Sequence, residues 1–376
     1  MRLAVLKERM AGEARVAATP ETVKKLAAMG LAVAVEAGAG LASGFPDADY
    51  AAAGAEIAAD AESALAGAGI VFAVRAPEAA LPRGAVLIGT LGADAAAAQA
   101  FAAAGIEAHA MELLPRITRA QSMDILSSQA NLAGYRAVVE GAAAFDRGFP
   151  MLMTAAGTVP AAQVFVMGAG VAGLQAIATA RRLGGRVSAT DVRPAAKEEI
   201  KSLGASFVGY EDEESRAAQT SGGYAKQLSA EFYAKQAEVV AAHIAKQDVV
   251  VCTALVQGRR APILVTAEMV GAMKPGSVIV VIAADAGGNC ALTRPGEISV
   301  SEGGVKILGW TNWPGRIPAA ASALYARNLL TFLTTFWDKD AGAPDFKAED
   351  DIVQGTALTR GGAVVHKLFA PAAAAA

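Results

Sequence analysis

Short apolar runs alternate with alanine-rich stretches along the first third of the chain. The runs have the length of strands, and they lie at Leu3–Leu6, Leu31–Glu36, Ile70–Val74, Val86–Thr90 and Ile106–Met111. Pro20–Met29 is predicted to be a helix, with Thr19 as its N-cap and Gly30 as its stop, and a later helix should end at Gly105. Strands that alternate with helices predict a parallel sheet with right-handed crossovers.

A second alternating series begins near Gln163. Its predicted strands are Val164–Met167, Arg186–Thr190, Ser206–Val208, Val249–Thr253 and Val278–Ile282, and its predicted helices are Ala172–Leu183 and Ala195–Leu203. A long helix over Ile125–Phe145 should connect the two series, and a late helix over Ala319–Trp337 should return the chain to the first domain. The tail Pro371–Ala376 is low in complexity and is expected to fray.

This order predicts an α/β fold with two Rossmann-like, parallel-sheet domains that are joined by long helices and have a nucleotide cleft between them. We expect residues 1–126 with 318–376 to form the N-terminal domain, which the C-terminal helix completes. Residues 127–317 are expected to form the dinucleotide-binding domain.

Residues 151–180 carry no charged side chain, and this length would suffice for a membrane span. Pro160 and several glycines divide the run into short pieces, so a strand, a glycine turn and a helix explain it better. The apolar start of the chain is broken at Lys7, too early for a signal peptide. We therefore expect no membrane span in this chain.

Composition narrows the functional classes. The chain is 54% hydrophobic and 18% charged, which predicts a globular protein, and much of the apolar share is alanine. The net charge of −3 argues against a nucleic-acid binder, which would show a basic patch. Cys252 and Cys290 both fall in apolar runs and are expected to be buried thiols in a reducing compartment.

The glycines that follow the strand Val164–Met167 carry the clearest chemical signal. Gly168, Gly170 and Gly173 match the spacing G-x-G-x-x-G and open a helix, which is the context that a dinucleotide site requires. The first glycine permits the tight turn, the second lets a pyrophosphate approach the backbone, and the third lets the helix pack on the strand. The helix start then offers N–H groups to phosphates.

Asp191 ends the next strand, at the distance where a carboxylate accepts hydrogen bonds from the adenosine ribose. It would repel a 2′-phosphate, which favours NAD(H) over NADP(H), although Arg193 could instead receive such a phosphate. A glycine-rich packing turn with a surface aspartate is the alternative that involves no ligand.

A general acid or base is not evident. The three histidines, His109, His243 and His366, are expected to be structural or exposed. Hydride passage directly between two nicotinamide rings moves no proton on the substrate, so a site without a base suits that reaction; Lys, Asp or Tyr could still serve as a base. The polar stretch Tyr210–Ser229 is either a functional loop or a solvated insertion.

Several blocks resemble one family closely. Residues 111–137 read MELLPRITRAQSMDILSSQANLAGYRA, and further matching blocks are residues 154–160, the glycine turn, and residues 189–193, 221–226 and 286–290. They resemble domain I, the NAD(H)-binding component of proton-translocating transhydrogenases. The opening, from Lys7 to Pro20, is similar to the start that this family shares with alanine dehydrogenases. The resemblance covers nearly the whole chain.

The resemblance implies roles for matching positions. Arg116, Gln121, Asp124 and Ser127 would orient the nicotinamide and its carboxamide, to which such side chains can donate and from which they can accept. From the residues alone, these positions indicate only a polar helix start with Asp124 near the N-cap. Val171, Asp191, Val192 and Arg193 would line the adenosine pocket, Gly223 and Tyr224 would form the tip of a closing loop, and Gln236 and Leu255 would add cofactor contacts. Tyr224 joins the first four as a candidate catalytic residue. No metal site is expected.

Departures from the family keep an alternative open. Leu228 stands where a methionine is familiar, and Asp285 stands where alanine dehydrogenases carry a catalytic aspartate. Those enzymes also have a lysine at the position of Arg75 and a histidine near Thr90-Leu91-Gly92, and this chain has neither.

The resemblance therefore predicts a subunit that binds NADH and passes its hydride to NADP⁺ on a partner component, while a membrane-spanning component couples the transfer to proton translocation. It implies a homodimer on the cytoplasmic side of the inner membrane, associated with it only through those partners. The alternatives are an alanine dehydrogenase and a non-catalytic NAD-sensing module.

Overall fold

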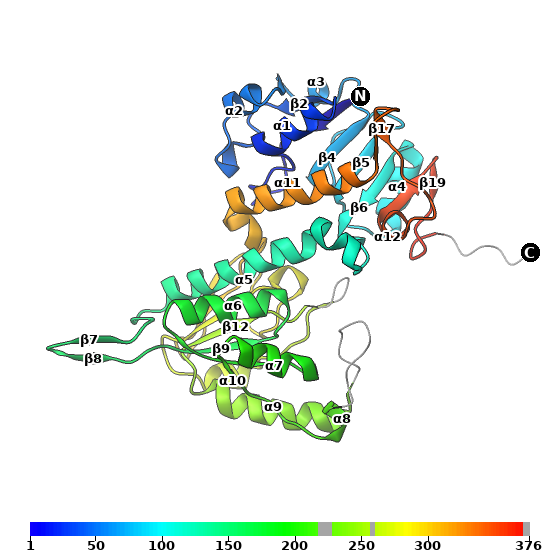
Figure 1. The fold of residues 1–376 in the computed structure, drawn as a ribbon. Helices are drawn as coiled ribbons and strands as arrows, with labels where there is room; N and C mark the ends of the chain where they lie inside the picture. Colours follow the sequence, from blue (N-terminus) through cyan, green and yellow to red (C-terminus); the bar gives the residue numbers. More distant parts are fainter. Residues whose placement is uncertain (217–227, 256–259, 371–376) are drawn as a thin grey trace, which may run out of the picture. The chain divides into compact units, whose positions relative to one another are not determined.

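The computed structural model describes residues 1–216, 228–255 and 260–370. The chain divides into two compact units, which are described separately (Figure 1). Unit 1 comprises Met1–Gln129 and Gly315–Ala376, and unit 2 comprises Ala130–Pro314.

Unit 1 contains an eight-stranded sheet in the order β19-β18-β6-β5-β4-β1-β2-β3. Its strands are β1 (Arg2–Val5), β2 (Ala32–Glu36), β3 (Glu56–Ala58), β4 (Ile70–Arg75), β5 (Val86–Thr90), β6 (Glu107–Ala110), β18 (Ala357–Arg360) and β19 (Ala363–Val364). Strands β1 to β6 pair in parallel, whereas β18 and β19 are antiparallel. The helices are α1 (Pro20–Ala28), α2 (Asp47–Ala52), α3 (Ala61–Leu65), α4 (Ala95–Ala104), α11 (Pro318–Thr335) and α12 (Asp351–Thr356), and a small hairpin is formed by β16 (Trp337–Asp338) and β17 (Ala343–Pro344).

Unit 2 contains a seven-stranded sheet in the order β11-β10-β9-β12-β13-β15-β14, parallel except for β14. Its strands are β9 (Gln163–Met167), β10 (Arg186–Thr190), β11 (Ser206–Phe207), β12 (Val249–Cys252), β13 (Val278–Val281), β14 (Ile298–Val300) and β15 (Lys306–Leu308). The helices are α6 (Val171–Arg182), α7 (Pro194–Ser202), α8 (Glu213–Arg216), α9 (Ala230–Ile244) and α10 (Ala267–Gly271), and α5 (Ile125–Ala144) starts in unit 1 and continues into unit 2.

The predicted fold class, with two α/β domains built on largely parallel sheets, is confirmed. Two details differ. The strand expected to reach Met111 ends at Ala110, and a 3₁₀ turn (Met111–Leu113) follows it. The polar stretch after Tyr210 contains the short helix α8, and the tail 371–376 lies outside the described residues. Within the described part of the chain, we find no helix whose length and apolar character would let it cross a membrane.

A β-hairpin was not predicted. Strands β7 (Leu152–Thr154) and β8 (Gly157–Val159) pair in antiparallel fashion and extend away from the unit 2 sheet (Figure 1). Leu152, Met153 and Val159 are 46%, 74% and 40% exposed. In the sequence, these residues open the uncharged run that continues into β9, so their apolar character indicated burial.

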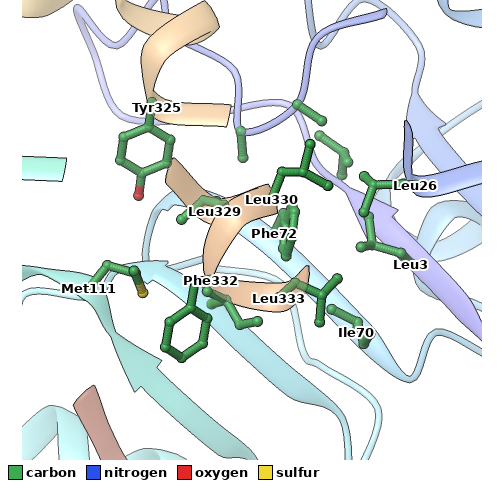
Figure 2. Close-up of a cluster of buried hydrophobic side chains, with 14 of the residues drawn as sticks. Leu3, Leu26, Ile70, Phe72, Met111, Tyr325, Leu329, Leu330, Phe332 and Leu333 are labelled. Carbon is green, nitrogen blue, oxygen red and sulfur yellow. The ribbon is translucent and has the colours of Figure 1, made fainter. Parts of the chain in front are cut away.

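Helix α11 supplies much of the unit 1 core. Leu329, Phe332 and Leu333 are fully buried and belong to one apolar cluster with residues of β1 and β4, such as Phe72 (Figure 2). The Phe332 ring lies 5.3 Å from that of Phe336 and 5.6 Å from that of Phe346. The C-terminal segment is thus part of the first domain's core, because the parallel sheet buries this face against α11.

Phe332→Ala should lower the free energy of unfolding by about 3–5 kcal/mol, since a fully buried aromatic side chain is removed and a cavity is left. Chemical denaturation followed by circular dichroism measures the change. Leu41→Ala, at a position 60% exposed, is the control and should change the midpoint little. Equal effects of the two substitutions would contradict the assignment of α11 to the core.

Candidate functional site

The strand order of unit 2 reverses between β9 and β12, which are direct neighbours. In open α/β sheets, ligands bind outside the carboxyl ends of the strands at such a switch point. Gly168 directly follows β9, Asp191 follows β10, and Thr253 follows β12. The sheet therefore gathers the residues that the sequence singled out for a dinucleotide at one edge (Figure 1).

Each glycine of the turn has a separate structural reason. Gly168 has φ +104°, a backbone conformation that side chains disfavour. A Cβ on Gly173 would lie 1.8 Å from the carbonyl oxygen of Gly168, so only glycine lets α6 approach the turn this closely. A Cβ on Gly170 would meet nothing within 4 Å. The space at Gly170 is therefore open to a ligand.

The start of α6 fits a phosphate group. Gly170 is its N-cap and offers no side-chain cap, and Val171 is 44% exposed. The first N–H groups of a helix have no intrahelical acceptor, and the helix dipole favours an anion there. The residues present thus fit the pyrophosphate of a dinucleotide.

The Asp191 carboxylate ties the glycine turn to the end of β10. Its Oδ2 accepts a hydrogen bond of 2.7 Å from the Ala169 N–H, and its Oδ1 accepts one of 2.8 Å from the Arg193 N–H. The Arg193 guanidinium also folds back onto it, with Nε 3.0 Å from Oδ1. Asp191 and Arg193 are therefore partners in this structure, and the two roles weighed for them in the sequence are physically coupled.

Other predicted contacts lie on neighbouring segments. The Gln236 side chain on α9 donates to the Thr190 hydroxyl at 2.9 Å and accepts from the Tyr210 N–H at 2.7 Å. Val192 packs against the buried side chains of Leu228 and Phe232, so leucine in place of methionine at 228 completes this packing. Leu255, three residues beyond β12, is 54% exposed.

Two supporting residues were missed by the sequence reasoning. The Thr253 hydroxyl donates to the Gly168 carbonyl oxygen at 3.0 Å, which fixes the turn from the neighbouring strand. Asn289 is fully buried, and its amide donates to the carbonyl oxygens of Ala254 at 2.8 Å and Pro262 at 3.0 Å. Asn289 lies in a block that resembles the family, but no spacing indicated what it holds.

The residues expected to orient a nicotinamide lie in unit 1, around the start of α5. Gln121 is exposed in a 3₁₀ helix (Thr118–Met123), and Arg116 is exposed before it. Asp124 accepts hydrogen bonds from the Ser127 N–H at 2.9 Å and the Ser127 hydroxyl at 2.5 Å. This is the N-cap geometry that the residues alone indicated.

Asn328 on α11 anchors this segment. Its amide donates to the Ser122 carbonyl oxygen at 2.9 Å, and its carbonyl oxygen accepts from the Ser128 hydroxyl at 2.8 Å. Ala120 and Met123 are buried beneath the segment. The exposed side chains are thus presented on a backbone that is held from below. Gly223 and Tyr224 lie outside the described residues.

Unit 1 has its own switch point, between β1 and β4, but carboxylates fill it. Glu8 accepts hydrogen bonds from the N–H groups of Val74 and Arg75 at the end of β4. Glu13 is buried and pairs with Arg15 at 2.6 Å and with Arg75 at 3.1 Å. A dinucleotide phosphate would be repelled here, so the unit 2 crevice is the candidate site.

Burial is the main cause that raises the pKa of Glu8 to about 7, and the nearby Glu13 charge adds to the rise. Burial also pushes the pKa of Glu13 upward, but its hydrogen bond and charge pairing with Arg15, together with the Arg75 charge, lower it to about 2. Two neighbouring carboxyl groups are therefore driven apart in pKa.

Glu8→Gln should change how stability depends on pH. The folded pKa of Glu8, about 7, exceeds its ordinary value of 4.5, so its contribution is complete below about pH 4.5 and is lost as pH rises through 7. The wild-type chain should lose up to about 3 kcal/mol relative to the variant between about pH 4.5 and pH 8. Denaturation at several pH values measures this difference. Glu62→Gln, at an exposed position, should follow the wild type, and parallel curves for Glu8→Gln would contradict the buried position of Glu8.

The three histidines have structural surroundings. His109 is fully buried on β6, where burial lowers its pKa, and its Nδ1 lies 3.2 Å from the Thr356 hydroxyl. The Nε2 of His243 contacts the Ser188 hydroxyl at 2.8 Å, and that of His366 contacts the Gly355 carbonyl at 3.1 Å. Among the described residues, no group of three or more histidines, cysteines or acidic residues could hold a metal ion.

The positions that kept an alanine dehydrogenase open are also engaged. Asp285 is exposed and accepts a hydrogen bond from the Asn312 N–H at 3.1 Å. Arg75 pairs with Glu13, and the Thr90 N–H donates to the Tyr325 hydroxyl oxygen at 2.8 Å. Both cysteines are buried as expected.

Comparisons with known proteins agree over the whole chain. Residues 4–133 match the N-terminal domain of the family alanine dehydrogenase/PNT, and residues 137–367 match its C-terminal domain. The chain is 54% identical to an NAD(P) transhydrogenase subunit alpha protein of Rhodospirillum rubrum, over 97% of this chain and 98% of that protein. An alanine dehydrogenase of Bacillus subtilis is 30% identical over 98% of this chain and 94% of its own length.

A crystal structure of transhydrogenase from Sinorhizobium meliloti has the same fold, with a TM-score of 0.87 and 52% identity over 97% of this chain and 100% of that chain. These findings confirm the predicted resemblance, the predicted role as an enzyme subunit and the binding of a nucleotide cofactor. The chain therefore belongs to the alanine dehydrogenase/PNT family and, within it, to the NAD(P) transhydrogenase alpha subunits.

Proposed function

We propose that unit 2 binds NAD(H) and that this chain passes hydride from NADH to NADP⁺ held by a partner component. The observation that carries the proposal is the glycine turn after β9, which opens at Gly170 onto the uncapped start of α6, with Asp191 beside it. The turn fits a pyrophosphate, and the carboxylate fits the ribose of a dinucleotide without a 2′-phosphate.

The reaction needs two rings in near-attack geometry and no proton transfer on the rings. When bound, NADH would supply a hydride from its dihydronicotinamide ring to the oxidised ring on the partner. Gln121, Asp124, Ser127 and Arg116 would hold the carboxamide and so fix the orientation of the ring. The cap bond between Asp124 and Ser127 supports this role, because it keeps both side chains in one conformation.

Unit 1 supports transfer between nucleotides rather than amino-acid oxidation. Arg75, at the position of a substrate-binding lysine in alanine dehydrogenases, is paired with Glu13. An alanine dehydrogenase would oxidise NADH steadily with pyruvate and ammonia, without a partner, and we expect no such activity. A mere NAD sensor would never reduce NADP⁺, even with the matching partner domain.

We further propose that the chain is a homodimer that meets an NADP(H)-binding component and a membrane-spanning component coupling transfer to proton translocation. The apolar side chains of the β7–β8 hairpin support contact with a second copy, because an exposed apolar arm is costly in water. The chain would lie on the cytoplasmic side of the membrane through these partners. The word "subunit" in the name of the Rhodospirillum rubrum relative supports partner components. Gly223, Tyr224, Gln236, Val192 and Leu255 would complete the pocket around the nucleotide.

Gly170→Ala should leave the thermal midpoint unchanged, since its Cβ would meet only open space, but should weaken NADH binding by about 1.4 kcal/mol or more, a tenfold change. Fluorescence titration with NADH measures the affinity. Gly271→Ala on α10 also adds a methyl group in open space and should bind NADH normally. Full binding by Gly170→Ala would remove the glycine turn from the site.

Gln121→Asn should slow hydride transfer by about tenfold to a hundredfold, because a shorter amide misplaces the ring. The assay combines the chain, an NADP(H)-binding partner domain, NADH and an oxidised NADP analogue, and follows reduction of the analogue. Gln99→Asn, exposed on α4, is the matched control. Unchanged transfer by Gln121→Asn would refute the orienting role, and no transfer by the wild type would refute the proposed function.

A further inference from the structure

The carboxylate expected to read the ribose is fully occupied by the chain itself. Oδ1 of Asp191 receives the Arg193 N–H at 2.8 Å and its Nε at 3.0 Å. Oδ2 receives the Ala169 N–H at 2.7 Å and Arg193 Nη2 at 3.3 Å. A carboxylate offers about four acceptor positions, and all four are used here.

The Arg193 guanidinium is held by more than this one partner. Its Nη2 also donates to the Ala169 carbonyl oxygen at 2.9 Å, and the Glu199 carboxylate lies 3.8 Å away. The Arg193 and Asp191 side chains are 24% and 10% exposed, so water screens the pair only partly. The arginine is therefore bound in a forked, charge-assisted geometry at the edge of the pocket.

We propose that Arg193 is a specificity-determining residue of the nucleotide site, kept from a 2′-phosphate by Asp191. The inference rests on the proposed binding of NAD(H) by unit 2. Asp191 acts twice: it repels the additional phosphate, and it holds the guanidinium that would otherwise receive that phosphate. A ribose hydroxyl needs only one acceptor position, so it can replace one arginine donor, whereas a phosphate must break the whole fork.

Removal of the carboxylate charge should therefore turn Arg193 into a phosphate-binding group. In Asp191→Asn, the amide oxygen can still accept from the Ala169 N–H, but the amide NH₂ then faces the guanidinium donors and no longer holds them. The released guanidinium remains next to the ribose position. Its pairing with a 2′-phosphate would be bidentate and sensitive to salt.

The test measures the affinities of NADH and NADPH by fluorescence titration for the full-length wild type, Asp191→Asn, Arg193→Gln and the double variant. Thermal melting checks folding, and Asp191→Ser provides a second route to the same release. The wild type should bind NADH and bind NADPH poorly. Asp191→Asn should gain about tenfold or more in NADPH affinity. The gain should be absent from the double variant and should shrink at high salt. Arg193→Gln should keep the preference for NADH.

The outcomes separate the two proposals. A wild type that binds neither nucleotide would overturn the proposed function and this inference with it. A wild type that binds NADH, combined with no NADPH gain in either folded Asp191 variant, would overturn only the inference. Survival of the gain in the double variant would also overturn the inference alone, because Arg193 would then not be its source.

Discussion

The hydrogen bond from the Ala169 N–H to the Asp191 carboxylate is the interaction on which the site depends. It joins the turn after β9 to the end of β10, across a pair of parallel strands. Thr253 fixes the same turn from the other side, through the Gly168 carbonyl. With both neighbours attached, the turn leaves its Gly170 side open and directs the start of α6 toward a ligand.

Two sheets of similar topology have opposite chemistry at their switch points. In unit 2 the crevice is lined by glycines and helix N–H groups, whereas in unit 1 it is filled by Glu8 and Glu13. Strand order alone would allow a nucleotide at either place. The charge that fills one crevice and the backbone donors that open the other decide between them, so the function follows from side chains more than from fold.

Much of this arrangement could be predicted from the sequence because the signals are local. The glycine spacing, Asp191 after the next strand and the cap at Asp124 each depend on residues close in the chain. Thr253 and Asn328 could not be found in this way, since their partners lie 85 and 206 residues away and only the packed sheet or helix brings them together. The β7–β8 hairpin was missed because its apolar residues imitate the buried strand that follows.

The central claim is that the carboxyl edge of the unit 2 sheet binds a dinucleotide that has no 2′-phosphate. A crystal structure of the chain soaked with NADH tests it most directly. The account predicts the pyrophosphate against Gly170 and the first N–H groups of α6, with the adenosine ribose beside residue 191. Density for the dinucleotide elsewhere, or a pocket that stays blocked by its own side chains at saturating NADH, would contradict it.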